Sequence, residues 1–213
     1  MIKTSNSKIS AVKLLSKLLK PILGFKTPLV ILSIFFKIPY YNKKYFSNVN
    51  EKRIKGTSKT FLPIISAFYE LAKLIGDQKA REVVTQFLFA HSLNVQRDWY
   101  LRTKIPNRSW EEFHTNHEYA MNYGIIKNNV HDKIIRDQNT YKFNMVKCSF
   151  HEVFSLAEIG WLTEPMCKSD EIVFNEYSNE MKFHRGGGTA DTLGRGGDRC
   201  VFIFERVNSK SID

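Results

Sequence analysis

The residues best suited to catalysis in this sequence are three cysteines and one aspartate that lie in one stretch of the chain. Cys148, Cys167 and Cys200 are the three cysteines of the chain, and all lie within residues 144–206. Asp170 follows Cys167 by three residues, so on a helix the two side chains share one face. A thiolate and a carboxylate in one pocket supply a nucleophile and a proton-transfer group. The spacing therefore predicts Cys167 and Asp170 as catalytic residues, and the alternative is a buried core cysteine beside a capping aspartate.

The same stretch offers donors for a metal ion and for a substrate carboxylate. His151 follows Cys148 by three residues, and together with the other cysteines it has the donor types of a tetrahedral zinc site. The sequence has no CxxC pair, so we expect neither a metal ion nor another cofactor. His184 and Arg185 precede a glycine-rich run, and a guanidinium fork is suited to a carboxylate. We predict both as substrate-binding residues, with a solvated basic pair at the edge of a loop as the alternative.

Length, cysteine number and charge limit the class of protein. A chain of 213 residues with 43% hydrophobic residues is long enough for one substantial core. An odd number of cysteines argues against a disulfide framework and favours a reducing cytoplasm. Residues 1–60 carry 13 of the 32 Lys and Arg and one acid, Glu51, so nearly all of the net charge of +11 lies there. Because the rest of the chain is almost neutral, we expect no nucleic acid partner for the core.

Residues 8–37 predict a basic helical arm. Ser10 to Ile22 carries apolar residues at helical spacing, with lysines on the other faces. Pro28 to Phe36 is apolar, but the distance between Lys26 and Lys37 is short of the roughly 20 residues that a spanning helix needs. We expect an arm that packs on the core. Contact with a membrane surface is the first alternative, and contact of the arm with nucleic acid is the second.

The rest of the chain predicts helices first and strands later. Apolar periodicity, capping residues and β-branched runs predict helices at Thr60–Ile75, Lys79–Leu93, Trp110–Tyr123 and Phe150–Ile159, and strands at Val130–Asp137, Tyr141–Val146 and 201–204. This order predicts an α+β fold, with N-terminal helices packed on a C-terminal antiparallel sheet with intervening helices. Tyr40–Lys59 is polar and basic and predicts a linker. We therefore divide the chain into an arm with its linker, 1–59, and a domain, 60–213.

The ordered motifs of the C-terminal part resemble those of the L-2-amino-thiazoline-4-carboxylic acid hydrolase family. They are Cys148, Cys167-x-x-Asp170 and Thr192-Leu-x-x-Gly196-x-x-x-Cys200-x-Phe202. The resemblance implies ring-opening hydrolysis of a cyclic amidine-like C=N bond, which gives an N-carbamoyl-cysteine type of product. It also adds Thr192 to the predicted substrate-binding residues.

A second, more distant similarity gives an alternative. The C-terminal part is also similar to ligand-binding domains of the 4-vinyl reductase type, some of which hold zinc with cysteines. Cys167 and Cys200 match two such ligands, whereas Thr192 stands in the place of a third. The sequence thus favours a cytoplasmic hydrolase that acts on a non-peptide C–N bond of a small cyclic amidine-like or cysteine-derived substrate. A non-catalytic small-molecule-binding domain and a membrane-associated accessory protein are the alternatives.

Overall fold

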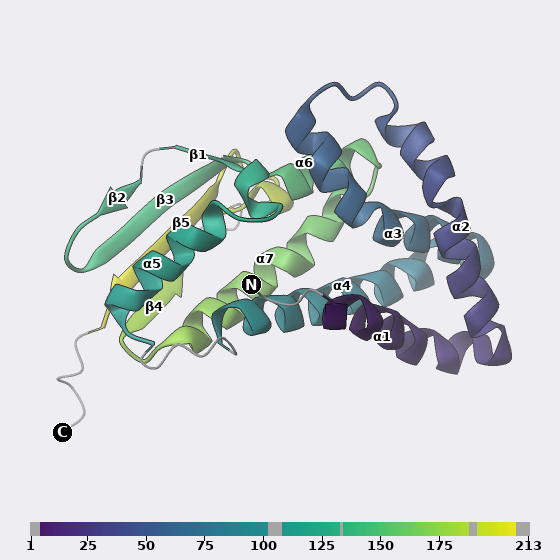
Figure 1. The fold of residues 1–213 in the computed structure, drawn as a ribbon, viewed down its shortest axis with the longest axis horizontal. Coiled ribbons are helices and arrows are strands. Elements are labelled where there is room, and N and C mark those ends of the chain that lie inside the picture. Colours follow the sequence, from purple (N-terminus) through teal and green to yellow (C-terminus); the bar gives the residue numbers. More distant parts are fainter. Residues whose placement is uncertain (1–4, 102–107, 133, 188–190, 208–213) are drawn as a thin grey trace.

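The protein has an α+β fold with a helical part and a sheet part. A computed structural model describes residues 5–101, 108–132, 134–187 and 191–207, and it describes side chains from residue 11 onward. Within these ranges, helices gather at one end of the molecule and an antiparallel sheet lies at the other (Figure 1). The predicted fold class is therefore confirmed.

The N-terminal helices pack on one another around an apolar core. α1 lies against α4, and α2 lies against α3. Gly76 ends α3 with a φ of 81°, which favours glycine, and donates its N–H to the carbonyl of Ala72. The helices are α1 (Ser5–Leu23), α2 (Thr27–Phe46), α3 (Lys52–Ile75) and α4 (Asp77–Tyr100), with a 3₁₀ turn, Gly24–Lys26, between the first two.

The predicted linker at Tyr40–Lys59 is wrong, because most of this segment is helical. α2 continues to Phe46 and α3 begins at Lys52. The segment is polar in composition, but one side of α2 is buried. Tyr41 lies on that side, and its hydroxyl donates a hydrogen bond to Glu70 over 2.8 Å. The arm therefore packs on the core through α2 and α3.

The sheet is antiparallel throughout and is built around its two longest strands. Its order is β1–β3–β5–β4, with β2 also paired to β3. In the register, Tyr141 lies opposite Phe204 and Phe143 lies opposite Phe202. The strands are β1 (Val130–His131), β2 (Ile135–Arg136), β3 (Thr140–Lys147), β4 (Met181–His184) and β5 (Cys200–Arg206).

The predictions for the strands hold in part. The predicted strands at Tyr141–Val146 and 201–204 are confirmed as β3 and β5. The predicted strand Val130–Asp137 is instead two short strands, and Lys133 between them lies outside the described residues. The Asp137 carboxylate closes the turn before β3, because it accepts the N–H groups of Asn139 and Thr140 at 2.8 and 2.7 Å.

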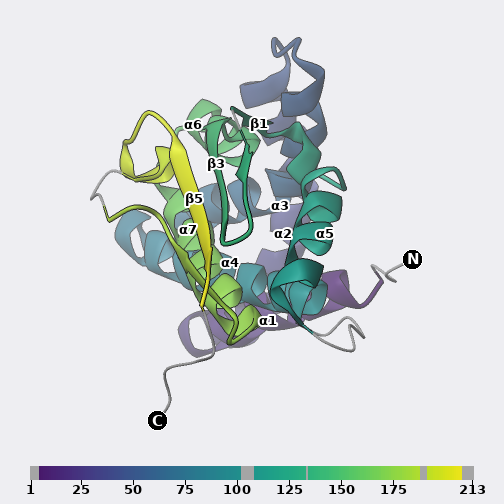
Figure 2. The ribbon, with the colours of Figure 1, turned by 90° about the vertical axis from the view of Figure 1, so that its left-hand side faces the viewer.

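Two helices cover one face of the sheet. Phe113 of α5 and Phe174 of α7 both pack on Phe204, with ring centroids 4.6 and 5.1 Å away. In Figure 2, β3 and β5 lie in front of α7 and α4. Ser109 caps the start of α5, because its side chain accepts the N–H of Glu112. The remaining elements are α5 (Trp110–Met121), α6 (Ser149–Leu156), α7 (Thr163–Tyr177) and the 3₁₀ turns Ile126–Asn128, Gly160–Leu162 and Leu193–Arg195.

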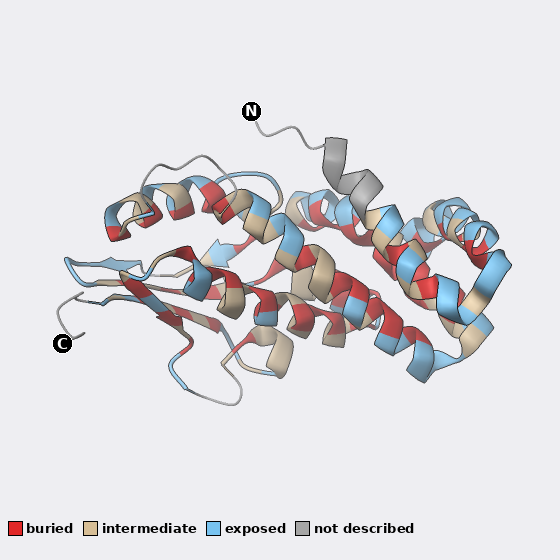
Figure 3. Cartoon of the chain, turned by 90° about the horizontal axis from the view of Figure 1, so that it is seen from below, coloured by how far each residue is buried: buried red, intermediate tan, exposed pale blue. Residues whose placement is uncertain are grey.

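Two apolar cores result, and α6 and α7 lie between them. One core belongs to α1–α4 and α6, and the other lies between the sheet, α5 and α7. Phe150 of α6 packs against both. Buried and exposed residues alternate along the helices in Figure 3, as expected for amphipathic packing. The sequence motifs of interest therefore lie where the two cores meet.

Candidate functional site

A cavity of about 60 Å³ lies between α7, the start of α6 and the covered face of the sheet. Cys148, Cys167 and Cys200 all line it, together with Asp170 and Arg185. The three thiols are free and buried. The fold thus brings the motifs of the C-terminal part to one place. The remaining lining residues are Gln96, Asn129, Met145, Phe150, Thr163, Met166 and Phe202.

α7 holds Cys167 and Asp170 one turn apart and turns both toward this cavity, as their spacing predicted. The Asp170 carboxylate is an acceptor on both sides. Its Oδ2 lies 2.9 Å from Nη2 of Arg185, and its Oδ1 accepts a hydrogen bond of 2.8 Å from Nε2 of Gln96. The side chain of Asp170 is 23% exposed and that of Arg185 is 2% exposed. The pair is therefore a buried ion pair with one partner open to the cavity.

Arg185 is held from several directions. Nη2 donates to the carbonyl of Cys167 and Nη1 donates to the carbonyl of Val201, both over 3.4 Å. The guanidinium carbon lies 4.5 Å from the centre of the Phe202 ring. Nε is 3.5 Å from Glu171, which is an ion-pair distance, but it makes no hydrogen bond within the described residues. Arg185 thus joins α7 to β5.

Burial controls the proton equilibria in the cavity. It raises the pKa of Asp170, while the charge of Arg185 and the hydrogen bond from Gln96 lower that pKa in part. Burial also raises the pKa of Cys167, and the nearby Asp170 adds to this effect. The pKa of Cys148 rises to about 12 for the same reason. All three thiols are therefore neutral at pH 7, since burial raises the pKa of Cys200 too.

The structure does not bring His184 or Thr192 to the cavity lining. His184 is the last residue of β4, and the alternation of the strand places it on the uncovered face of the sheet, opposite to Phe183. Its Nε2 lies 3.3 Å from Glu205. Thr192 is buried, and its Oγ1 has no hydrogen-bond partner among the described residues. Gly188, in the run between them, lies outside the described residues.

Sequence reasoning missed three polar residues of the cavity, Gln96, Asn129 and Thr163. Gln96 belongs to α4, beyond the predicted end of that helix at Leu93, and reaches Asp170 from 74 positions away. Thr163 begins α7, and its hydroxyl lies 3.2 Å from Nδ1 of His151. No local pattern signals Gln96, whereas the pair of Cys148 and His151 gave a partial indication of this region.

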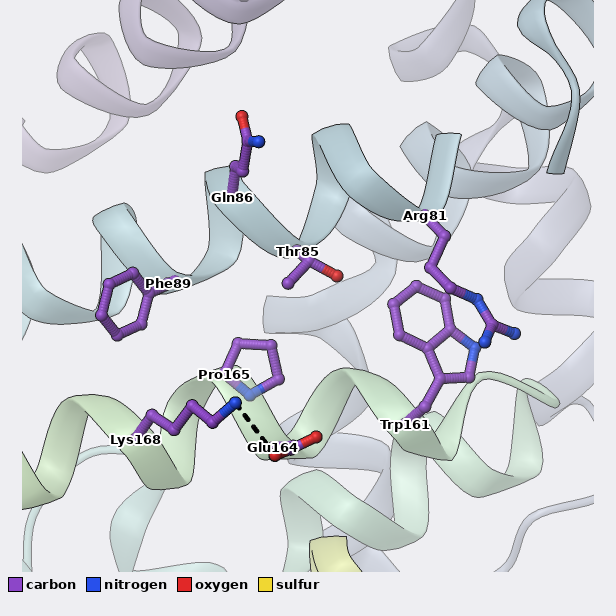
Figure 4. Close-up of a pocket in the computed structure, with 8 residues that line it drawn as sticks. All are labelled: Arg81, Thr85, Gln86, Phe89, Trp161, Glu164, Pro165 and Lys168. Carbon is purple, nitrogen blue, oxygen red and sulfur yellow. Dashed lines mark ion pairs between the residues drawn. The ribbon is translucent and has the colours of Figure 1, made fainter. Parts of the chain in front are cut away.

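A larger open cleft lies between α7 and α4 (Figure 4). Its volume is about 430 Å³, within the range of small-molecule sites. Arg81 lies over the ring of Trp161 at 4.4 Å, and Lys168 pairs with Glu164 at 3.0 Å. Cys167 and Asp170 are not among its lining residues. One side of α7 therefore faces the cleft and an adjacent side faces the enclosed cavity.

Within the described residues, no group of three or more His, Cys, Asp or Glu is arranged to hold a metal ion. The cavity is instead a site with a carboxylate, a guanidinium and neutral thiols.

The comparison with protein families gives one match, which extends from α3 into β5. The family model for L-2-amino-thiazoline-4-carboxylic acid hydrolase matches residues 57–204. No curated protein and no solved structure matches the chain. The matched range covers more than half of the chain and contains every residue that lines the cavity. The chain therefore belongs to the L-2-amino-thiazoline-4-carboxylic acid hydrolase family.

Proposed function

We propose that this protein hydrolyses a small cyclic amidine-like or cysteine-derived substrate at a non-peptide C–N bond, in the cavity at Asp170. The family match supports a hydrolase-like function at the level of the family. The observation that carries the proposal is the convergence of Asp170, Arg185 and three buried thiols on one cavity within the matched range. A carboxylate with a raised pKa beside a fixed cation is a common arrangement for proton transfer.

The chemistry assigns water as the nucleophile. Water adds its oxygen to the carbon of the amidine-like C=N bond. In a 2-amino-thiazoline ring the C–S bond at that carbon then breaks, and the departing sulfur takes up a proton, so that the carbamoyl group stays on nitrogen. Asp170 accepts the proton of the attacking water and returns it to the departing atom. Cys167 forms a polar wall, because a neutral thiol is a poor nucleophile. Arg185 holds Asp170 in place and offers its remaining edge to a substrate carboxylate.

Substrate entry requires movement of the cavity wall. A volume of about 60 Å³ is below the roughly 300–1,000 Å³ of typical small-molecule sites. Met145 and Met166 both line the cavity, and unbranched thioether side chains change rotamer easily. We place the opening at these two methionines. We also propose a cytoplasmic location, which the three free thiols support.

The decisive experiment compares two carboxylates of α7. The assay follows hydrolysis of 2-amino-thiazoline-4-carboxylate and related cyclic amidines by product mass, with a thermal melt of each variant. Asp170→Asn should reduce turnover by about 10²–10⁴-fold, the typical contribution of a general acid–base group. Glu164→Gln, in the surface cleft, should leave it within a few-fold. Cys167→Ser should retain at least about a tenth of the activity, because the thiol does not attack.

A second variant keeps the carboxylate and moves its pKa. Gln96 lowers the pKa of Asp170 through its hydrogen bond, so Gln96→Leu raises that pKa further. If ionised Asp170 is the base, the acidic limb of the pH–rate profile should shift to higher pH in this variant.

Full activity of a folded Asp170→Asn variant would refute the site. Ligand binding without turnover across the panel would favour the non-catalytic binding domain. His184→Ala and Thr192→Val, tested for a rise in KM, decide whether these two residues contact substrate.

A further inference from the structure

The outer side of α2 exposes a row of large apolar side chains. The exposed fractions are 87% for Phe25, 67% for Leu29, 52% for Leu32, 74% for Phe36 and 56% for Tyr40. Successive members are three or four positions apart, so they lie on one side of the helix and of the 3₁₀ turn before it. We call these five residues the outer α2 face. A continuous apolar row of this kind on a soluble monomer marks a contact surface.

Lysines border the outer α2 face. Lys26 follows Phe25 and Lys37 follows Phe36, and both lysines are exposed. Their separation of eleven positions places them along the same edge of the apolar row. Residues 1–60 hold 13 of the 32 Lys and Arg with a single acid, so the surroundings are strongly positive. An apolar stripe bordered by lysines is complementary to a bilayer that contains anionic lipids.

From these observations we propose that the outer α2 face docks in the plane of an anionic membrane surface. The opposite side of α2 is occupied by the protein itself. Ile34 is 2% exposed, its carbonyl accepts a hydrogen bond of 2.6 Å from Ser66, and Tyr41 is bonded to Glu70. A helix that is packed on one side and apolar on the other lies on a membrane with its exposed side inserted.

A spanning helix and a second copy of the chain fit this surface less well. Among the described residues, Ala11–Phe46 is long and apolar enough to cross a membrane by length and composition alone. Crossing would require α2 to leave α3 and expose the hydrogen-bonded groups of Ser66 and Glu70. Pairing of two outer α2 faces would bring two lysine-bordered surfaces together, and like charges oppose that contact.

The test is sedimentation of the full-length protein with vesicles at low salt. Vesicles of phosphatidylcholine with 30% phosphatidylglycerol are compared with vesicles of phosphatidylcholine alone, at ~0.05 M and at ~0.5 M salt, where exposed charges are screened. We expect binding to the anionic vesicles that falls steeply with salt. Lys26→Gln/Lys37→Gln should weaken binding by roughly 30-fold, about fivefold for each lost charge. Phe25→Ser/Phe36→Ser should weaken it at least tenfold even at low salt.

Matched controls come from the sheet part and from α6. Lys147→Gln/Lys182→Gln removes two exposed lysines of the strands, and Leu156→Ser removes an exposed leucine of α6. Both should bind like the wild type. Equal binding by the Phe25→Ser/Phe36→Ser variant, or no binding of wild type at low salt, would overturn the proposal. So would resistance to alkaline carbonate extraction, which indicates a spanning helix, or a dimer in solution that dissociates in the Phe25→Ser/Phe36→Ser variant. Turnover in solution is a separate readout, so failure here leaves the proposed hydrolase activity unaffected.

Discussion

Replacement of Arg185 by methionine tests how strongly the ion pair at the cavity stabilises the charge of Asp170. Arg185→Met keeps a long apolar stem against Phe202 but removes the cation 2.9 Å from Asp170. Removal of one partner of a buried pair costs about 3–5 kcal/mol, because an uncompensated charge stays behind. Asp170 is 23% exposed and keeps its hydrogen bond from Gln96, so we expect a loss near the lower end, about 3 kcal/mol.

A double variant separates the unpaired charge from other effects of the substitution. Arg185→Met/Asp170→Asn has no charge left to desolvate, so it should be about 1–2 kcal/mol more stable than Arg185→Met alone. The measurement is urea unfolding of the wild type, both single variants and the double variant at pH 7, followed by circular dichroism. The coupling energy is read from the four free energies of unfolding.

The pH dependence gives a further check with a defined sign. Arg185 lowers the pKa of Asp170, so its removal raises that pKa further above the value in the unfolded chain. A carboxyl whose folded pKa is raised binds its proton more readily in the folded state, so the loss of stability should shrink as pH falls from 7 toward 4. The reasoning would be refuted if the losses of unfolding free energy were additive across the four proteins and if Arg185→Met lost the same amount at pH 7 and pH 5. Arg185 would then neither stabilise the charge of Asp170 nor lower its pKa.

Two further predictions concern other buried groups. Burial lowers the pKa of His117 from 6.5 to about 3. The free energy of unfolding should therefore fall by on the order of 4–5 kcal/mol as pH falls from about 6.5 to 3, because the buried imidazole must take up a proton. Urea unfolding at a series of pH values measures this, and constant stability between pH 6.5 and 4 would contradict it. The three neutral, buried thiols should react with a disulfide reagent only slowly at pH 8 in the folded protein and rapidly in denaturant; one fast thiol in the folded protein would show that a cysteine of the cavity is activated.

Periodic apolar patterns were sufficient to predict those helices and strands that pack on one side only. The strand β3 alternates buried and half-buried residues along its length, and β5 does so in its buried portion, so both were predictable from sequence. The arm is harder to interpret. Segment 40–59 is polar, and its few apolar positions, such as Tyr41, are buried only because α3 folds back on α2. Composition alone cannot reveal that long-range contact.

In the site, too, local contacts were predictable from the sequence and long-range contacts were not. The pairing of Cys167 with Asp170 was predictable because helical spacing is local, whereas the ion pair with Arg185 depends on where β4 ends relative to α7, and the bond from Gln96 depends on the packing of α4 against α7. Arg185 was predicted to hold a substrate carboxylate, but the structure gives it a carboxylate of the protein as its first partner. The two roles are compatible only if substrate binding and the pKa of Asp170 are linked. A substrate carboxylate that draws on the charge of Arg185 would raise the pKa of Asp170 and favour proton uptake by it. Proton transfer at Asp170 would then depend on an occupied cavity.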